Sequence, residues 1–417
     1  MKRLIFHVDV NSAYLSWEAA RRVVEGEADI RLIPSAIGGD KEKRTGVILA
    51  KSIPAKEFGI RTGEPVAMAL RKCPNLFLAK PDFRLYEKSS EAFMNICREY
   101  APVVEKYSID ECFLDMSGTG KIYPDPIAIA TRIKNEIRDT LNFTVNIGIG
   151  SNKLLAKMAS DFEKPDKIHT LFPEEVEAKL WPLPVRELFT VGQATAERLK
   201  KLYIFTIGDL AKTELRRVQL LVGEKSGRQI YDYANGIDNS PVLSGAEDAK
   251  GYSSSTTLEE DVKTTEEAYR ILLALADSVA SRMRADGAKA FCISVIIRGN
   301  DFKNKSRQRK LGEPTDITTE IYDVVKKLFS ELWDKRTPLR LLGISLSHLT
   351  RDRCVQQSFF PNREKERGKK LDKAIDSIRS KFGPDMVARG SLFQSSIEVG
   401  RKYRAQMENK KAKRKNG

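Results

Sequence analysis

The sequence predicts an α+β protein with a ferredoxin-like βαββαβ domain near its N-terminus and a second βαββαβ domain further along. Segments with the periodicity of strands and helices follow one another in the order β, α, β, β, α, β within residues 4–150. The same order returns within residues 251–350. The length of 417 residues also exceeds what one hydrophobic core can hold, so three or four domains are expected.

The first domain begins with a β-rich strand over residues 4–10, after which Asn11 or Ser12 can cap a helix. A lysine-rich stretch with many Gly and Pro residues, 39–65, is expected to form a small irregular insertion. The remaining elements are two short strands that meet near residues 108–110, a helix over 125–141 and a strand over 143–150.

The second domain has clear helix and turn signals. Thr264 and Glu267 form a capping box that opens a helix, and Gly287 ends it. A hairpin is expected around Gly299 and Asn300. The other elements are a strand from residue 251, a helix over 318–333 and a closing strand over 339–349. A helical segment and a linker rich in Gly, Asn, Asp and Ser separate the two domains, and a further helix follows residue 350.

Composition narrows the class of partner. Lys and Arg number 72 against 57 Asp and Glu, so the net charge is +15, which favours a polyanion, nucleic acid before membrane. No segment is apolar enough to cross a bilayer, and Asp9 interrupts the apolar run at the N-terminus. That run is therefore predicted to be a strand and the protein cytoplasmic. The five cysteines and three histidines lack the spacing of a zinc site or a disulfide framework.

The stretch "YSIDECFLD" places Asp110 and Glu111 side by side among residues of a buried strand. Two adjacent carboxylates repel each other unless a positive charge lies between them. A solvated acidic hairpin is the simpler reading of this stretch alone. In a βαββαβ sheet, however, the first and third strands are neighbours, so Asp9 is expected close to Asp110 and Glu111.

Three carboxylates without histidine or cysteine form a hard oxygen site of the kind that suits Mg²⁺. Two such ions about 3.5–4 Å apart would stabilise the attacking and leaving oxygens of a phosphoryl transfer. Taken alone, Asp9 would be read as a helix cap at the end of a strand.

The motifs "FHVDVNSAYLSWEA", "YSIDECFLD" and "GIGSNKLLAKMASDFEKPD", in this order, resemble the Y-family translesion DNA polymerases, nearest the DNA polymerase IV branch. The resemblance covers essentially residues 1–350 and is highly specific. It implies a palm (1–10 and 82–170), small fingers (11–81), a helical thumb (171–240), a linker (241–250), a little finger (251–350) and a C-terminal tail (351–417).

The resemblance also implies a function. It is template-directed addition of deoxynucleotides to a primer 3′-OH, error-prone and without proofreading, in translesion synthesis and DNA repair. Asp9, Asp110 and the Val10 carbonyl would hold two Mg²⁺ ions, and Glu111 would be the catalytic acidic residue and a further metal ligand. The expected partners are primer–template DNA and a dNTP, and the chain is expected to act as a monomer.

Tyr14 falls where the family has a steric gate against the sugar 2′-OH, although a core aromatic on an amphipathic helix is the alternative. The backbone N–H groups of Asn11, Ser12, Ala13 and Tyr14 lie at a helix N-terminus and are predicted to cradle phosphate.

The triphosphate ligands depart from the family in part. In "SIPAKEFGI", Ile53 stands where the family commonly has tyrosine and Lys56 where it has arginine. Lys56 keeps the charge but loses the bidentate fork of arginine. Lys164, in "EKPD", matches the family's other phosphate ligand, whereas alone it would be an ordinary surface residue.

Two basic segments are candidates for DNA contact. The stretch "FTVGQATAERLKKLYIFTIGDLA" resembles a helix-hairpin-helix, although Thr190 and Tyr203 replace usual family residues and a plain helical hairpin is the alternative. Phosphate binding would there use Gly192, Lys200 and Lys201. In "DFKNKSRQRKL", every second residue is basic and would share one face of a strand, either to bind DNA or to protect a sheet edge: Lys303, Lys305, Arg307 and Arg309.

The segment 356–360, Gln-Gln-Ser-Phe-Phe, resembles the short peptide with which bacterial polymerases bind their sliding clamp. Gln356 would be the polar anchor, and Phe359 and Phe360 would fill an apolar pocket. The alternative is that the two phenylalanines dock the tail on its own little finger.

Two rival functions fit the sequence less well. A nucleotidyl cyclase shares a palm-like fold but predicts neither a thumb nor a basic second domain. A non-catalytic DNA-damage scaffold would have an eroded carboxylate triad, whereas Asp9, Asp110 and Glu111 are all present.

Overall fold

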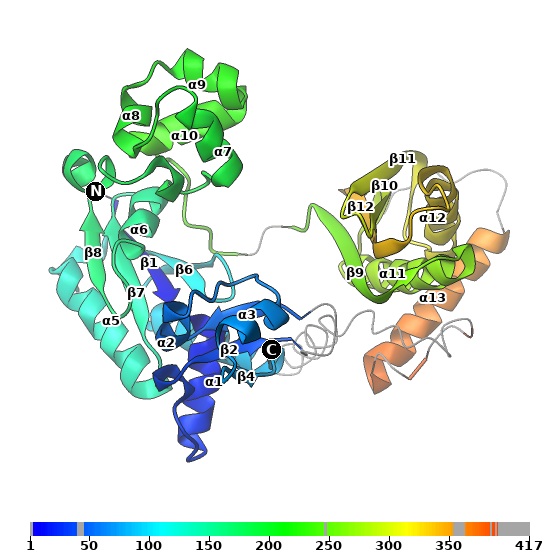
Figure 1. The fold of residues 1–417 in the computed structure, drawn as a ribbon, viewed down its shortest axis with the longest axis horizontal. Helices are drawn as coiled ribbons and strands as arrows, with labels where there is room; N and C mark the ends of the chain where they lie inside the picture. The colour runs from blue at the N-terminus through cyan, green and yellow to red at the C-terminus, as the bar shows by residue number, and fades with distance from the viewer. Residues whose placement is uncertain are drawn as a thin grey trace. The chain divides into compact units, whose positions relative to one another are not determined.

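The structure is a computed structural model that describes residues 3–39, 46–245, 248–352, 363–383, 386, 387 and 390. The chain divides into two compact units, which are described separately (Figure 1). The first unit comprises residues 1–40 and 47–246, and the second comprises residues 41–46 and 247–417.

The first unit is built on a five-stranded sheet in the order β5–β6–β1–β7–β8. The central strand β1 pairs antiparallel with β6 on one side and with β7 on the other, while β7 and β8 are parallel. The prediction that the first and third strands of the βαββαβ unit are adjacent is thus confirmed. The strands are β1 Ile5–Val10, β5 Val103–Lys106, β6 Glu111–Asp115, β7 Val145–Gly150 and β8 Ile168–Leu171.

Helices cover both faces of this sheet. Successive side chains of β1 point to opposite faces and so pack against different helices. Phe6, Val8 and Val10 join the large core formed with α1 Ala13–Val24, α4 Phe83–Tyr100 and α5 Pro126–Leu141. Ile5 faces the other way and packs with Phe113 and with a residue of α6 Lys153–Ser160. By the period of two along a strand, His7 and Asp9 share the α6 face.

The close approach of α6 to β7 requires glycine. A Cβ atom at Gly148 would lie 1.9 Å from the Ala156 carbonyl oxygen, and one at Gly150 would lie 2.8 Å from the Ala156 nitrogen. Any larger residue would push α6 away from the sheet.

The lysine-rich insertion contains more order than the sequence indicated. A three-stranded sheet in the order β3–β2–β4 packs with two short helices around its own small core. Its strands have only three or four residues, too few for an alternation to be read. The elements are η1 Ile30–Leu32, β2 Ser35–Gly38, β3 Ile48–Lys51, α2 Ile53–Glu57, α3 Val66–Lys72 and β4 Phe77–Ala79.

A helical segment completes the first unit around a separate apolar cluster. Its helices are α7 Gln193–Lys200, α8 Ile207–Lys212, α9 Leu215–Val222 and α10 Glu224–Ala234. Short helical turns elsewhere in the unit are η2 Thr119–Lys121, η3 Pro173–Glu175, η4 Val176–Leu180 and η5 Val185–Glu187.

The second unit has the predicted β, α, β, β, α, β order but another strand arrangement. Its antiparallel sheet runs β11–β10–β12–β9, so the second and fourth strands of the unit are central. In the first unit the first and third strands are central. The elements are β9 Gly251–Val262, α11 Thr265–Ala285, β10 Lys289–Gly299, β11 Asn304–Thr315, α12 Thr318–Leu332 and β12 Leu339–Thr350.

A further helix, α13 Arg363–Phe382, docks on α11 and α12 through a buried ion-pair network. Arg284 of α11 contacts Asp376 at 2.7 Å and Asp372 at 3.3 Å. Asp372 also accepts a hydrogen bond of 2.7 Å from the Thr318 backbone N–H, so it satisfies a free donor at the start of α12. Gly368 lies where a Cβ atom would approach Ile317 to 2.8 Å.

Replacing Arg284 with Met should undock α13, because Asp372 and Asp376 would lose the cation that compensates their burial. Breaking a buried ion pair from one side costs about 3–5 kcal/mol. Hydrogen exchange followed by mass spectrometry should therefore show strongly increased exchange across residues 363–382.

The matched control is Lys365→Met on the same helix, which removes more exposed pairs with Glu313 and Glu320 and should change exchange much less. Unchanged protection of α13 in Arg284→Met would contradict the role assigned to this network.

Candidate functional site

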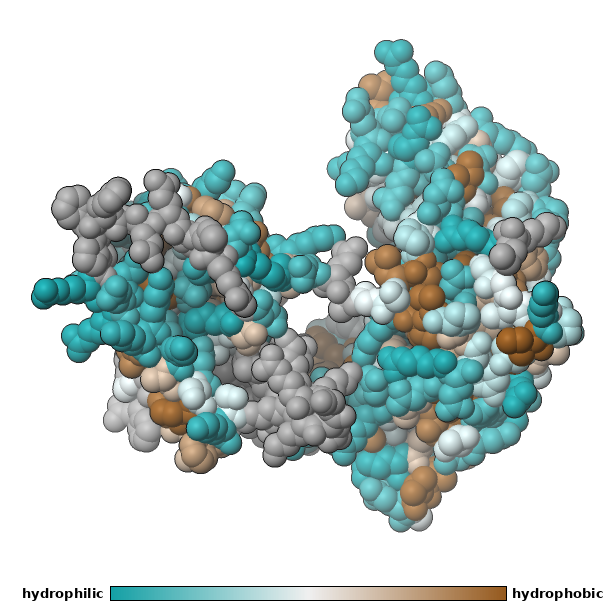
Figure 2. Space-filling view, turned by 180° about the vertical axis from the view of Figure 1, so that it is seen from behind, coloured by the Kyte–Doolittle hydropathy of each residue, from teal (hydrophilic) through white to brown (hydrophobic). Residues whose placement is uncertain are grey.

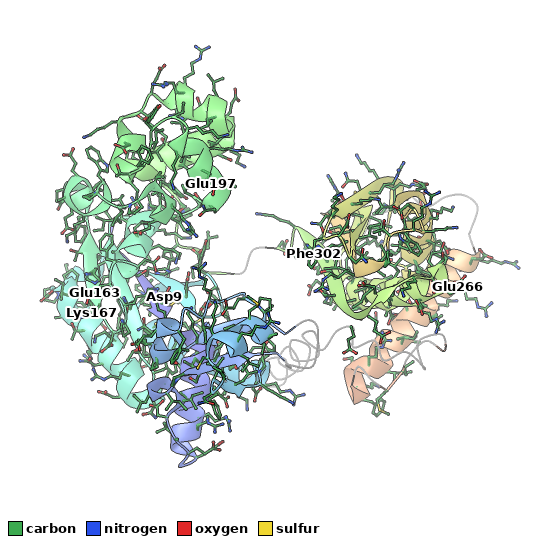
Figure 3. The ribbon with its side chains drawn as sticks, viewed as in Figure 1. Asp9, Glu163, Lys167, Glu197, Glu266 and Phe302 are labelled. Carbon is green, nitrogen blue, oxygen red and sulfur yellow. The ribbon has the colours of Figure 1, made fainter. Side chains whose placement is uncertain are left out.

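The carboxylates singled out from the sequence come together where β1 and β6 pair. Asp9 lies directly opposite Glu111 in the ladder, and the Val10 N–H donates a hydrogen bond of 3.0 Å to the Asp110 carbonyl oxygen. Figure 3 labels Asp9 within this sheet of the first unit. Like charges on directly opposed residues destabilise a sheet, so the pair requires compensation.

Lys164 compensates Asp9. The Asp9 side chain is buried, and its Oδ1 lies 2.9 Å from the Lys164 Nζ, which also contacts Asp161 at 2.8 Å. Burial raises the pKa of Asp9, and the ammonium group of Lys164 opposes that rise. Burial alone would lower the pKa of Lys164, but the carboxylates of Asp9 and Asp161 outweigh it and the net shift is upward. The predicted residue Lys164 is thus in direct contact with a predicted metal ligand.

Two residues that the sequence did not single out surround Glu111. Its Oε2 lies 3.1 Å from the Nζ of Lys157 on α6 and 3.4 Å from the Nε2 of His7. His7 is fully buried, and its pKa is lowered to about 3 by burial first and then by the charge of Lys157. The ring is therefore neutral at physiological pH. Neither residue carries a sequence signal by itself, because Lys157 reaches Glu111 through the packing of α6 on the sheet and His7 reaches it through the pairing of β1 with β6.

Asp110 lies in the turn before β6 and is held by Ser108. The Ser108 Oγ donates to the Asp110 Oδ1 at 2.5 Å and accepts from the Asp110 N–H at 3.2 Å. The ring of Tyr14 packs against Tyr86 at 4.7 Å between centroids. Burial, followed by the charge of Asp110, raises the pKa of the Tyr14 hydroxyl. Tyr14 therefore lies within electrostatic reach of the acidic site.

The donor set can be compared with what a divalent cation requires. Carboxylate oxygens and a backbone carbonyl are the hard ligands that Mg²⁺ prefers, and Asp9 and Glu111 are near enough for the charge of Glu111 to raise the pKa of Asp9. Lysine ammonium groups now neutralise both carboxylates. Among the described residues, no three acidic, His or Cys side chains already converge as a metal site. The chemistry of these residues therefore fits a divalent cation. Binding it requires the Asp9 and Glu111 carboxylates to turn away from Lys164 and Lys157.

The segment between β1 and α1 is fixed to the neighbouring β7 segment by a backbone hydrogen bond. Ser12 has a left-handed backbone (φ 48°), and the Asn11 N–H donates to the Thr144 carbonyl oxygen at 3.0 Å. This bond already uses the Asn11 N–H, whereas Ser12, Ala13 and Tyr14 form the start of the helix.

The two residues that depart from the family lie on α2. The side chains of Ile53 and Lys56 are both exposed. Lys51, on the neighbouring strand β3, has its pKa lowered by burial and then by the charge of Lys56. A second lysine that the sequence did not single out therefore lies near Lys56.

The helix-hairpin-helix candidates lie around α7. Gly192 is the N-cap of this helix, Lys200 ends it and Lys201 follows, and all three are exposed. Thr190 and Tyr203, the residues that depart from the family, both have left-handed backbones, with φ of 74° and 59°. Glycine adopts this conformation without strain, which explains a preference for glycine there.

The four alternating basic residues Lys303, Lys305, Arg307 and Arg309 form a basic stripe, of which only the last three lie on a strand. Lys305, Arg307 and Arg309 share one face of β11, and Lys303 precedes the strand. That face is the one of the core residues opposite on β10, so it lies toward the helices. Arg307 and Arg309 accordingly contact Glu331 at 2.9 and 3.0 Å, and Lys305 contacts Asp334 at 3.2 Å. Acidic groups of α12 and the loop after it thus partly neutralise the stripe.

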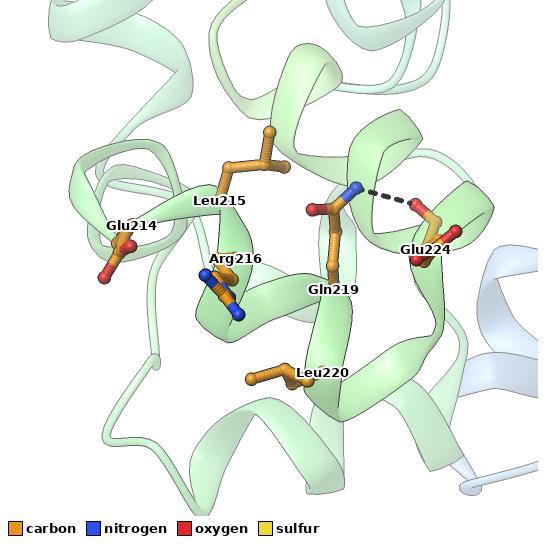
Figure 4. A pocket seen from close by; sticks show the side chains of 6 residues that line it. All are labelled: Glu214, Leu215, Arg216, Gln219, Leu220 and Glu224. Atoms are coloured by element: carbon orange, nitrogen blue, oxygen red, sulfur yellow. Dashed lines mark hydrogen bonds between the residues drawn. The ribbon is translucent and has the colours of Figure 1, made fainter.

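An open pocket of about 590 Å³ lies elsewhere, between α9 and the start of α10 (Figure 4). The Gln219 amide donates to the Glu224 carbonyl oxygen at 3.3 Å across it. Its lining contains none of the predicted residues and consists of Glu214, Leu215, Arg216, Gln219, Leu220 and Glu224.

The surface of both units is mostly hydrophilic in the view of Figure 2, with scattered apolar patches. Across the described residues, no helix has the length and apolar character needed to span a membrane. Gln356, Phe359 and Phe360 lie outside the described residues.

Comparisons with known proteins agree with the geometry. Residues 8–161 match the impB/mucB/samB family, residues 249–359 match its C-terminal domain, and residues 186–238 match the thumb domain of DNA polymerase-iota. DNA polymerase IV of Clostridium acetobutylicum is 45% identical over 94% of this chain and 99% of its own length. DNA polymerase IV of Clostridium kluyveri is 38% identical over 95% and 100%. A solved Y-family DNA polymerase chimera, 23% identical, has the same fold with a TM-score of 0.71 over 84% of this chain and all of its own.

Proposed function

Since this chain belongs to the impB/mucB/samB family, it is a Y-family translesion DNA polymerase, and we propose that Asp9, Asp110 and Glu111 are its catalytic carboxylates. The observation that carries the assignment is the register of β1 and β6. In this register Asp9 lies opposite Glu111, and the Val10 N–H donates a hydrogen bond to the Asp110 carbonyl oxygen. A cyclase or a non-catalytic scaffold is not favoured, because the relatives matched over nearly the whole chain are polymerases.

Divalent metal dependence follows from the family, and two Mg²⁺ ions are our specific proposal. Such ions would lower the pKa of the primer hydroxyl and neutralise the triphosphate. Asp9, Asp110, Glu111 and the Val10 carbonyl would hold them. In that arrangement Lys157 and Lys164 would leave the carboxylates of Glu111 and Asp9 that they contact here.

Lys164 is the residue best placed for such a change of partner. Its side chain is 36% exposed, and it contacts Asp9 and Asp161. A dication on Asp9 would displace the ammonium group, which could then bind a phosphate oxygen of the dNTP. Lys56 would add a second cation, and the N–H groups of Ser12, Ala13 and Tyr14 at the start of α1 would add neutral donors, whereas the Asn11 N–H is bonded to Thr144.

Tyr14 is proposed as the gate against ribonucleotides. Trp17 and Tyr86 hold its ring at centroid distances of 5.9 and 4.7 Å, so the ring cannot easily move aside. The effect of the Asp110 charge on the pKa of the Tyr14 hydroxyl supports a place for the ring beside the sugar of a nucleotide bound at the carboxylates.

DNA contact is assigned to two regions. The thumb would bind phosphate through Gly192, Lys200 and Lys201. The stripe Lys303, Lys305, Arg307 and Arg309 would bind phosphate only by exchanging Asp301, Asp334 and Glu331 for the DNA backbone. Its contribution to affinity should thus be smaller than four unpaired cations would give.

We further propose a monomeric cytoplasmic enzyme with the domain boundaries predicted from the sequence and with a clamp-binding peptide at residues 356–360. The peptide lies between β12, which ends at Thr350, and α13, which begins at Arg363. A tether to a sliding clamp raises the local concentration of a weakly bound polymerase.

Replacing Asp110 with Asn should reduce primer extension by more than about 100-fold, because one charge of the metal site is lost, while DNA affinity is kept. The measurement is single-turnover extension of a primer on a gapped template with and without Mg²⁺. Asp115→Asn, at the far end of β6, is the matched control and should retain activity. Wild-type turnover of Asp110→Asn would refute the catalytic assignment.

Replacing Tyr14 with Ala should open space beside the sugar and admit ribonucleotides. The ratio of kcat/KM for rNTP to that for dNTP should rise by at least about tenfold, the effect of 1.4 kcal/mol. Tyr14→Phe retains the ring and should retain discrimination. An unchanged ratio in Tyr14→Ala would exclude the gate.

Replacing Phe359 and Phe360 together with Ala should reduce extension on clamp-loaded primer and leave clamp-free extension intact. Phe382→Ala, which truncates an exposed phenylalanine of α13, is the control and should change neither. If the double variant melts earlier and loses activity equally with and without clamp, the two phenylalanines are structural and the clamp proposal is wrong.

A further inference from the structure

We propose that Asn146 is a positioning residue for Lys164: its buried amide fixes both ends of the loop that holds this lysine beside the triphosphate of the incoming nucleotide. The proposal rests on the proposed function, because it takes Lys164 as a ligand of that triphosphate. It deepens the assignment by naming the group that determines where the lysine lies. The loop comprises residues 161–167, between α6 and β8.

The alternation of β7 places Asn146 at the end of α6. The odd-numbered residues of the strand enter the large core, namely Val145, Ile147 and Ile149. The even-numbered residues face α6, and Asn146 is the first of them, followed by the two glycines on which the helix packs. A Cβ atom at Gly148 would lie 2.4 Å from the Ser160 nitrogen, so the last turn of α6 lies close to Asn146. Asn146 is fully buried and lies opposite Asp9 in the ladder of β1 and β7.

The amide of Asn146 bonds to the main chain at three points. Its Nδ2 donates to the Glu163 carbonyl oxygen at 2.6 Å and to the Ser160 carbonyl oxygen at 3.1 Å, and its Oδ1 accepts from the Lys167 N–H at 3.2 Å. A backbone carbonyl can only accept and a backbone N–H can only donate, so these partners fix which amide atom is nitrogen and which is oxygen. Both hydrogens of the amide and its oxygen are thus engaged.

These three bonds bracket Lys164. Glu163 directly precedes the lysine, Ser160 ends α6, and Lys167 directly precedes β8. The Ser160 carbonyl is among the last four of α6, which have no partner within a helix, so the amide also satisfies a free acceptor. Figure 3 labels Glu163 and Lys167, whose side chains contact each other at 3.5 Å. The start and the end of the loop are therefore held together on one side chain of the sheet.

The main chain of the loop is fixed, whereas the side chain of Lys164 can change partner. Lys134 of α5 adds a second anchor, because its Nζ lies 2.9 Å from the Asp166 carboxylate and 3.2 Å from the Asp166 carbonyl oxygen. With the main chain held, side-chain rotation carries the ammonium group from Asp9 to a phosphate oxygen. A nucleotide bound at the carboxylates then meets a cation whose place is already set, which reduces the entropy lost on binding.

A structural role alone would not act through Lys164, and Asn152 provides the comparison. Asn152 is also buried, and it caps the start of α6, at the other end of the helix from the loop. Its Nδ2 donates to the Gly236 carbonyl oxygen at 2.8 Å, and its Oδ1 accepts from the Leu155 N–H at 2.8 Å. The two asparagines thus make similar bonds, and of the two it is Asn146 that bonds to the loop.

The first test measures the loop and needs neither metal nor nucleotide. Asn146→Ala removes all three bonds, and Asn146→Thr leaves a single hydroxyl on a residue that favours strands. In the full-length protein, hydrogen exchange followed by mass spectrometry should be faster across residues 161–167 in both variants. Asn152→Ala should leave the exchange of this segment as in the wild type. Unchanged exchange of the loop in both Asn146 variants would overturn the proposal.

The second test measures nucleotide affinity without chemistry. The full-length protein, bound to a primer–template whose primer ends in a dideoxynucleotide, is titrated with the complementary dNTP and Mg²⁺. Lys164→Ala, Asn146→Ala and Asn146→Thr should each raise the Kd for dNTP by about tenfold, the effect of one hydrogen bond to a charged group. In the Lys164→Ala chain neither Asn146 substitution should raise the Kd further, because the residue through which it acts is gone. Any effect of Asn152→Ala should be the same in both backgrounds.

The outcomes are separable. Wild-type Kd in the two Asn146 variants would overturn the positioning role, as would an increase of the same size in the presence and absence of Lys164. Asn146→Thr decides the matter if Asn146→Ala is too unstable to measure. If Lys164→Ala itself binds dNTP as tightly as the wild type, the ligand role of Lys164 in the proposed function is wrong and the positioning role falls with it.

Discussion

The antiparallel pairing of β1 with β6 is the constraint on which the first unit depends. Its register sets Asp9 against Glu111, and the surrounding structure buries Asp9 and partly buries Glu111. Such a pair is unstable without nearby cations, so the structure must bring lysines to it. Lys157 can reach Glu111 only because α6 lies directly on β7, and that contact is possible only because Gly148 and Gly150 have no side chains. Two glycines in one strand thus determine how the carboxylates in the next strands are neutralised.

This dependence explains what could be predicted from the sequence and what could not. The strand and helix periods predicted the order of elements in both units, and the strand neighbourhood then predicted that Asp9 and Glu111 meet. The contact of Lys157 with Glu111 could not be predicted, because it requires the distance between a helix and a sheet, which no local pattern encodes. The small sheet of the insertion was missed for another reason: strands as short as β4, with three residues, show no alternation.

The second unit shows the same limit for charged residues. Alternation along β11 predicted that Lys305, Arg307 and Arg309 share a face, and they do. It could not predict that Glu331 and Asp334, more than twenty residues later, would meet them there. The sheet order also differs between the two units although their element order is identical, because a βαββαβ sequence does not by itself determine which strands become central.

The docking of α13 bears on where the second unit ends. The motifs read from the sequence cover residues up to about 350, yet Arg284 and the start of α12 find their partners beyond that point, at Asp372 and Asp376. A chain cut after β12 would leave a guanidinium group and a helix N-terminus without them. The smallest fragment that satisfies the polar groups of this unit therefore extends through α13, to residue 382.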